Sequence, residues 1–254
     1  MHLGLVTYNL AKDWDLEALI ANCEQTGFAG VELRTTHAHK VESDLNPARR
    51  AKVRKRFADS QVELVGLGTA FEFDALDPAE LQRHIEGTKA YLQLAADLGA
   101  AGVKVRPNRL HEDEGVPREQ TFEQIGRALR QCGECAADLG VQLRLEVHGR
   151  VTCEPPHIRK MLDCADHPSV VACWNSNQQD LSGGSIDANF ALLAGRIGLV
   201  HINELWSEYP WQRLFALLRQ SGYRGYCLAE IPESPEPLRL MRYYRALWQL
   251  QAEG

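Results

Sequence analysis

The sequence predicts an α/β fold, a (β/α)8 TIM barrel with eight parallel strands, built as a single domain over residues 1–254. Three observations lead to this prediction. Short apolar runs alternate with longer amphipathic segments, which indicates parallel strands joined by helical crossovers. Eight such units in 254 residues fit a closed barrel better than an open sheet. The first expected strand also lacks the following G-x-G-x-x-G turn that an open dinucleotide-binding sheet needs.

The elements are recognised in order by their composition and by the residues at their ends. The eight expected strands begin near Leu3, Phe28, Val62, Gly102, Val141, Val170, Ile197 and Tyr226. Asp15 is a suitable N-cap for the first helix, and Gly27 is a suitable stop. A longer helix is expected over residues 78–98, with Gly99 after it. Further helices are expected at 121–139 before Gly140, and after the prolines at 155–156, 210 and 235–237.

Composition and charge exclude several classes of protein. The chain has 28 Lys+Arg against 34 Asp+Glu, a net charge of −6, which argues against nucleic acid as a partner. No apolar run approaches the ~20 residues of a membrane span, and the opening segment lacks the basic start of a signal peptide. Seven irregularly spaced cysteines indicate reduced thiols. We therefore expect a cytoplasmic protein that does not bind membranes. Whether it forms a homo-oligomer stays open.

The alternation of side chains along each strand predicts which residues face the barrel axis. In the fifth expected strand, the odd-numbered residues from Val141 to Val147 are apolar and the even-numbered ones are polar. The polar residues with this inward parity are Glu32, Arg34, Lys104, Arg106, Gln142, Arg144, Glu146, His148, Asn175, His201, Asn203 and Glu230. Ionisable groups in a core are costly unless they are paired or bound to metal. Their convergence where strands end predicts a site at that face of the barrel.

The strongest candidates within this set are Glu146, His201 and Glu230. Two carboxylates and an imidazole suit Mn²⁺, Co²⁺, Zn²⁺ or Fe²⁺, and suit Mg²⁺ less well. Such an ion can hold two adjacent oxygens of a sugar or hydroxyketone and stabilise an enediolate. A carboxylate on each side of the neighbouring carbon can remove a proton and return one. The residues therefore suit proton transfer next to a carbonyl.

Further inward residues are candidate substrate contacts. They are Lys104, Arg106, His148, Asn203, Glu32 and Arg34. Glu32 and Arg34 serve equally well as ion-pair partners of neighbouring charges, and Arg144, one layer deeper, is expected to be a structural ion-pair partner. Four aromatic residues lie near strand ends and either wall a sugar face or pack the loops: Tyr8, Phe71, Trp174 and Trp206.

Five segments carry a resemblance to a known family: GFAGVELR, RLEVHGR, ACWNSNQQD, HINEL and LAEIPES. At these residues the sequence resembles the xylose isomerase-like TIM-barrel superfamily, the sugar phosphate isomerase/epimerase group, over nearly the whole chain. In that family a glutamate, an aspartate, a histidine and a glutamate on strands five to eight bind one divalent ion. The resemblance places these ligands at Glu146, Asn175, His201 and Glu230. It also implies that the two glutamates act as the acid/base pair.

The sequence departs from the family pattern at two positions. The family aspartate is Asn175, and the histidine that commonly follows three residues later is Gln178. An asparagine offers a carbonyl oxygen but no negative charge. We therefore expect weaker metal binding, with a more Lewis-acidic ion. His148 is an alternative ligand, and loss of the metal is the other alternative.

The leading hypothesis is an isomerase or epimerase of carbohydrate metabolism that acts on a sugar or keto-sugar by metal-assisted proton abstraction next to a carbonyl. A lyase or hydratase acting on keto-glycosides or inososes through the same enolate is the first alternative. A sugar-binding barrel without catalysis, which has lost its metal because of Asn175, is the second.

Four other features have structural interpretations. The basic segment at 47–57 is expected to be a solvated helix face that buries Val53 and Phe57. The C-x-x-C at 132–135 is expected to hold structural thiols, because no second pair accompanies it. Residues 182–185 are expected to form a turn. The histidines at 37 and 39 lie on a loop near the mouth of the barrel, where a substrate contact is the less favoured interpretation.

Overall fold

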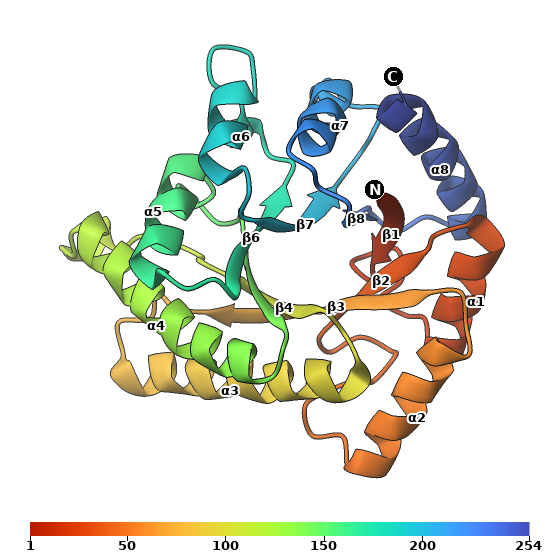
Figure 1. The fold of residues 1–254 in the computed structure, drawn as a ribbon, viewed down its shortest axis with the longest axis horizontal. Helices are drawn as coiled ribbons and strands as arrows, with labels where there is room; N and C mark the ends of the chain where they lie inside the picture. Colours follow the sequence, from red (N-terminus) through yellow and green to blue (C-terminus); the bar gives the residue numbers. More distant parts are fainter. Residues whose placement is uncertain (254) are drawn as a thin grey trace.

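Eight parallel strands close into a barrel in the order in which they occur along the chain, and helices surround it (Figure 1). The structure is a computed structural model that describes residues 1–253. The strands are β1 (His2–Val6), β2 (Gly30–Arg34), β3 (Glu63–Glu72), β4 (Gly102–Arg106), β5 (Gln142–Glu146), β6 (Val170–Asn175), β7 (Ile197–Ile202) and β8 (Tyr226–Ala229). β8 pairs with β1, where His2 lies beside Tyr226, so the sheet closes on itself. The predicted barrel is confirmed.

A helix follows every strand, and each of the first seven leads the chain back to the start of the next strand. The helices are α1 (Leu16–Thr26), α2 (Pro47–Ala58), α3 (Pro78–Leu98), α4 (Arg118–Asp138), α5 (Pro155–Ala165), α6 (Asp187–Leu193), α7 (Trp211–Gln220) and α8 (Pro237–Glu253). Two short 3-10 helices, η1 (Glu112–Glu114) and η2 (Gln178–Asp180), lie in the loops after β4 and β6. Because every strand runs in the same direction, all eight loops that follow a strand gather at one end of the barrel.

The helix ends follow the predicted local chemistry. The Asp15 side chain accepts a hydrogen bond from the Ala18 amide at 2.8 Å, and Gly27 ends α1 in the left-handed conformation. Gly99 ends α3 in the same way. α4 begins three residues earlier than expected, at Arg118, because Pro117 is the N-cap residue. Its φ of −58° and ψ of 138° are an extended conformation, from which the helix starts at the next residue. Capping residues, glycines and prolines in the sequence therefore predicted most helix ends correctly.

The predicted alternation along β5 is confirmed. Leu143, Leu145 and Val147 are fully buried in the core between the sheet and the helices. A second, smaller apolar cluster fills the barrel interior, and it consists of Val6, Val65, Cys173, Leu199 and Leu228. Arg144 lies inside the barrel as expected, but it donates hydrogen bonds to the Val65 carbonyl (3.0 Å) and to the Gln142 side chain (3.1 Å). These bonds replace the expected ion pair, because neutral acceptors lie closer to its guanidinium.

The structural interpretations of three other features also hold. In α2, Phe57 is buried and Val53 is half-buried, while most basic side chains between them are exposed. All seven cysteines are free thiols, and Cys132 is buried in α4. Residues 182–185 form a turn closed by a bridge between Ser182 and Ser185. Across the described residues, no helix combines the length and the apolar character needed to cross a bilayer.

Candidate active site

A cavity of about 470 Å³ opens at the end of the barrel where the strands finish. Ten residues line it: Tyr8, Arg34, Lys104, Arg106, Glu146, His148, Asn175, Asn177, Asn203 and Glu230. They come from seven of the eight strands or the residues that follow them directly. Most of the predicted site residues are therefore brought together, although they are spread over some 200 residues of sequence.

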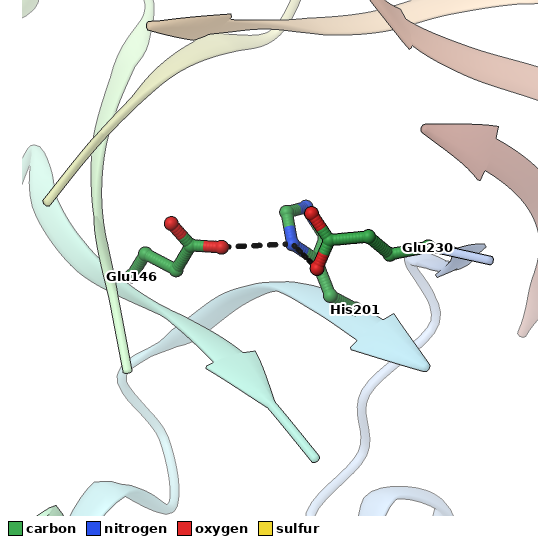
Figure 2. A group of neighbouring side chains, drawn as sticks. All are labelled: Glu146, His201 and Glu230. Atoms are coloured by element: carbon green, nitrogen blue, oxygen red, sulfur yellow. Dashed lines mark ion pairs between the residues drawn. The ribbon is translucent and has the colours of Figure 1, made fainter. Parts of the chain in front are cut away.

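Glu146, His201 and Glu230 converge at the bottom of this cavity. One ligand atom from each lies within 4.8 Å of the others. Figure 2 shows the side chains of Glu146 and Glu230 reaching from different strands toward the same nitrogen of the His201 ring. His201 Nδ1 lies 3.3 Å from Glu146 Oε1 and 3.8 Å from Glu230 Oε2. Three ligand atoms at these separations can surround one divalent ion.

The other side of the His201 ring faces a fourth ionisable residue. Glu32 Oε1 lies 3.3 Å from His201 Nε2, and both side chains are completely buried. Gly68 makes room for Glu32, because a Cβ at this position would lie 2.6 Å from Glu32 Oε1. Within the described residues, neither ring nitrogen makes a well-directed hydrogen bond. A histidine with a carboxylate behind one nitrogen and an open second nitrogen has the arrangement of a metal ligand. The site therefore fits a divalent ion on the Nδ1 side.

Lys104 forms a buried ion pair with Glu146. Its Nζ lies 2.8 Å from Glu146 Oε2, and each side chain is only 2% exposed. Burial raises the pKa of Glu146, but the charge of Lys104 and the contact with His201 together outweigh this effect and hold the pKa well below its usual range. Because Lys104 occupies Oε2, Oε1 is left to face His201.

Glu230 lies in a different environment from Glu146. Burial raises the pKa of Glu230 above its usual value, and Arg34, at 3.7 Å, compensates only in part. The two carboxyl groups thus have pKa values that are displaced in opposite directions. Such a pair suits one group for accepting a proton and the other for donating one.

Asn175 occupies the fourth predicted ligand position. Its Nδ2 lies 3.4 Å from Glu146 Oε1, so in this orientation the amide donates to the carboxylate. Rotation of this amide by 180° would turn its carbonyl oxygen toward Glu146. Gln178 lies in η2, is exposed, and does not line the cavity.

The remaining predicted contacts line the upper wall of the cavity. Arg106 pairs with Glu72 at 2.6 Å, and Arg34 lies over the ring of Tyr8, 5.3 Å from its centre. The Asn203 side chain donates to the Ser176 carbonyl at 2.8 Å. Burial lowers the pKa of His148. These residues present mainly donors to the cavity.

Several expectations need correction. We predicted Glu32 as a substrate contact, but it is completely buried beneath His201 and does not line the cavity. Of the four aromatic residues, Tyr8 alone is part of the cavity lining. Trp174 has outward parity and packs on Phe190 behind the sheet; Phe71 packs on His84 and Tyr91; Trp206 is 77% exposed.

The two loop histidines lie outside the cavity lining. His39 is buried and bonds the Arg34 carbonyl at 2.8 Å, which makes it a structural residue of the β2–α2 loop. His37 bonds the Thr7 hydroxyl at 3.1 Å. Asn177, which was not among the predicted residues, lines the cavity, and its side chain donates to the Val147 carbonyl at 2.7 Å. Continuing the parity of Asn175 by two residues would have found it.

Solved structures with similar folds include two sugar epimerases. D-psicose 3-epimerase from Clostridium cellulolyticum superposes with a TM-score of 0.84 at 13% identity, covering 99% of both chains. The 3-keto-D-glucoside 4-epimerase of E. coli superposes with a TM-score of 0.82 at 16% identity, covering 98% of this chain and 99% of that one. At such identities the likeness shows the fold alone.

A third similar structure contains a metal. It is the IOLI protein with a bound zinc atom, with a TM-score of 0.79, 15% identity, and coverage of 99% of this chain and 96% of that one. A search of curated proteins by sequence gives no match. The family model described as xylose isomerase-like TIM barrel matches residues 20–247, which is most of the chain. The chain therefore belongs to the family of xylose isomerase-like TIM barrels.

Proposed function

We propose that the protein is an isomerase or epimerase of a sugar or keto-sugar, and that it transfers a proton at the carbon next to a carbonyl with the help of one divalent ion. The observation that carries this proposal is the convergence of Glu146, His201 and Glu230 at the bottom of an open polar cavity. The two epimerases of similar fold support the same reaction class.

The ion would be held by Glu146 Oε1, His201 Nδ1 and Glu230, with the Asn175 carbonyl oxygen as the candidate fourth ligand. When bound, it supplies positive charge that stabilises the oxygens of an enediolate. Mn²⁺, Co²⁺, Zn²⁺ and Fe²⁺ suit this mixed nitrogen and oxygen set better than Mg²⁺ does.

The residues of the chain perform the proton transfer. Lys104 keeps Glu146 ionised, so this carboxylate is available to accept a proton from the substrate carbon. Glu230, which reaches the same His201 nitrogen from β8, would return a proton to the other face of that carbon. Glu32 holds the His201 ring so that Nδ1 faces the cavity side. Lys104, Arg106, His148 and Asn203 orient substrate oxygens.

A sugar-binding barrel without catalysis is the second candidate, and Asn175 is the observation that favours it. An amide in this position brings no negative charge to a cation, and here its nitrogen faces Glu146. A lyase or hydratase would share the first proton abstraction and differ only in expelling a neighbouring oxygen. A cytoplasmic location and self-association stay predictions.

The test combines metal analysis with isotope exchange. Protein purified without chelator is analysed for bound metal, and keto-sugars are then incubated with it in D₂O. We expect close to one equivalent of metal and deuterium at the carbon next to the carbonyl. Glu230→Gln removes the exchange, while Glu123→Gln, on the exposed face of α4, keeps it. Sugar binding that survives Glu230→Gln, without exchange in the parent, would favour the binding barrel.

A further inference from the structure

Asp180 is a buried carboxyl group that the proposed mechanism does not use. It is the last residue of η2, in the loop between β6 and α6, and its side chain is completely buried. Oδ2 accepts hydrogen bonds from the Tyr209 hydroxyl at 2.7 Å and from the Asn177 amide at 2.9 Å. Oδ1 is buried with no partner among the described residues. A carboxyl group in such surroundings is costly to bury, so its presence needs an explanation.

The Asn177 side of this network joins the ends of β5 and β6. The two residues cap η2 reciprocally, because Asp180 accepts from the Asn177 amide and the Asn177 side chain accepts from the Asp180 amide. Asn177 Nδ2 donates in turn to the Val147 carbonyl at 2.7 Å and to the Asn175 carbonyl at 3.1 Å. Val147 directly follows Glu146. Asn177 therefore holds together the two strand ends that carry Glu146 and Asn175.

The Tyr209 side of the network adds the loop after β7. The Tyr209 hydroxyl donates to Asp180 and accepts from Trp174 Nε1 at 3.2 Å, and all three side chains are buried. Trp174 belongs to β6, and Tyr209 lies in the loop between β7 and α7. Asp180 therefore connects the ends of three neighbouring strands of the barrel, β5, β6 and β7 (Figure 1).

The surroundings of Asp180 do not favour its charged form. The groups around it are the Tyr209 hydroxyl of the β7–α7 loop, the Cys153 thiol before α5, the Trp174 indole of β6 and the Asn189 amide of α6, and none of these is a cation. Burial raises the pKa of Asp180 from its ordinary value of 3.8 to about 7, because its two hydrogen bonds offset the lost hydration only in part.

We propose that Asp180 is a positioning residue of the candidate active site: in its neutral form it holds together the ends of β5, β6 and β7 through Asn177 and Tyr209, and its ionisation loosens them. The physical reason is that an ionised Asp180 regains its hydration only when the loop opens. The effect on catalysis rests on the proposed function, because these strand ends carry the proposed metal ligands. The opening of the loop does not depend on that function.

The direction and the range of the pH dependence follow from the pKa values of the closed and the open loop. Below about pH 4, Asp180 is protonated in both states and the loop is held most tightly. Between about pH 4 and pH 7 only the open state is ionised, so the equilibrium constant for opening should rise by up to tenfold per pH unit. Above about pH 7 both states are ionised and the constant should level off.

Amide hydrogen exchange of the full chain, measured by mass spectrometry, tests the proposal without a substrate. Exchange is followed at four values from about pH 5 to about pH 8, and each rate is divided by that of the unstructured peptide. Chelator is present, so that metal binding adds no pH dependence of its own. In segments 174–182 and 203–210, opening should rise roughly 10- to 100-fold between about pH 5 and pH 7, and little above. α3 is the internal control and should not show this rise.

Three variants make the test specific. Asp180→Asn keeps the shape and stays neutral at every pH, so the ratio of opening between about pH 7 and pH 5 should fall to about one. Tyr209→Phe removes one hydrogen bond, and it should increase opening at every pH while the pH dependence remains. Asp138→Asn, the same change at an exposed position of α4, is the matched control and should behave like the parent.

A parent protein without the rise would overturn the proposal. A purely structural role for Asp180 would change the level of opening in Asp180→Asn and keep the pH dependence of the parent, and this result would also overturn it. If thermal unfolding shows that Asp180→Asn does not fold, the carboxyl signals of ¹³C-labelled aspartate in the parent decide. A carboxyl that titrates near pH 7 and is displaced by Tyr209→Phe supports the proposal, and its absence contradicts it. Keto-sugars that exchange no deuterium would contradict the proposed function and leave this inference standing.

Discussion

Two layers of side chains share the barrel interior and lie two residues apart on the same strands. In β7 and β8, Leu199 lies below His201 and Leu228 lies below Glu230; in β6, Cys173 lies below Asn175. On these three strands the lower layer is apolar and packed, while the upper layer is polar and borders the cavity. Side chains that all point into the barrel therefore stabilise the fold in one layer and form the candidate site in the other. Substitutions in the upper layer should reduce activity, and substitutions in the lower layer should reduce stability.

The upper layer gives the largest expected effect, on activity. Glu230→Gln removes a proton-transferring carboxyl and a candidate metal ligand, so we expect deuterium exchange to fall by about 10²- to 10⁴-fold. Glu230 is partly exposed at the cavity, with its nearest cation 3.7 Å away, so the melting temperature should change little. Exchange rates and thermal unfolding of the same preparation check this. An active Glu230→Gln protein would remove Glu230 from the mechanism.

Lys104 and Glu146 connect the upper layer to stability. Lys104→Met leaves the Glu146 carboxylate buried without its cation, so we expect unfolding in chelator to require about 3–5 kcal/mol less free energy. The double variant Lys104→Met/Glu146→Gln removes both charges and should recover much of this loss. Urea unfolding of the parent, the two single variants and the double variant gives the coupling energy. Additive losses would show that the pair does not contribute as an ion pair.

The lower layer should affect stability alone. Leu199→Ala leaves a cavity in a completely apolar cluster, and we expect a loss of about 2–5 kcal/mol in the free energy of unfolding. Below the unfolding transition, metal affinity and exchange per folded molecule should stay near the parent values. A variant that is stable but loses its metal would show that the two layers are not separable.

Strand alternation could predict which side chains enter the barrel, but not how deep they lie or what they contact. It placed Glu146, His201 and Glu230 correctly because each follows an apolar neighbour on its strand. It could not show that Glu32 lies beneath His201, or that Lys104 meets Glu146, because such contacts depend on the register between strands.

Trp174 shows a different limit, because two interpretations were left open for it, a wall of the cavity or packing. Its outward parity was readable from its neighbours in β6 and favours packing, which the structure shows. Likewise, the pairing of Arg106 with Glu72 joins two strands whose register shifts between Gly68 and Glu72. The local sequence shows which side of a strand each residue faces, whereas a register shift between strands arises from the packing of whole strands and cannot be predicted from it.

Glu32 tests whether a buried residue beneath His201 acts through its neighbour. Glu32→Gln keeps the shape but removes the charge that faces His201 Nε2, so we expect metal affinity to fall by about 10- to 100-fold. Calorimetric titration with Mn²⁺ or Zn²⁺ measures this. A purely structural role would lower the melting temperature and leave the metal affinity unchanged, and this outcome would contradict the assignment.

Asn175→Asp gives the smallest expected change and the most specific one. The new carboxylate would lie about 3.4 Å from Glu146 Oε1, the distance that the Asn175 nitrogen now has. Without metal, two like charges at this separation repel, and the variant should unfold at a lower temperature than the parent. With metal, the added negative charge should tighten binding by about tenfold, because ligand charge sets the affinity for cations.

The sign of the effect should therefore reverse between metal-free and metal-loaded protein. Melting curves in chelator and in excess Mn²⁺, together with metal titrations, measure both arms. Ser176→Asp is unsuitable as a control because Ser176 is buried against the His201 carbonyl, whereas Gln178→Asp, one turn farther along and exposed, is suitable and should show no reversal. If Asn175→Asp destabilises the protein equally with and without metal, Asn175 is not part of a cation site. If only the variant binds metal, the natural protein is better explained as a barrel that binds its sugar without an ion.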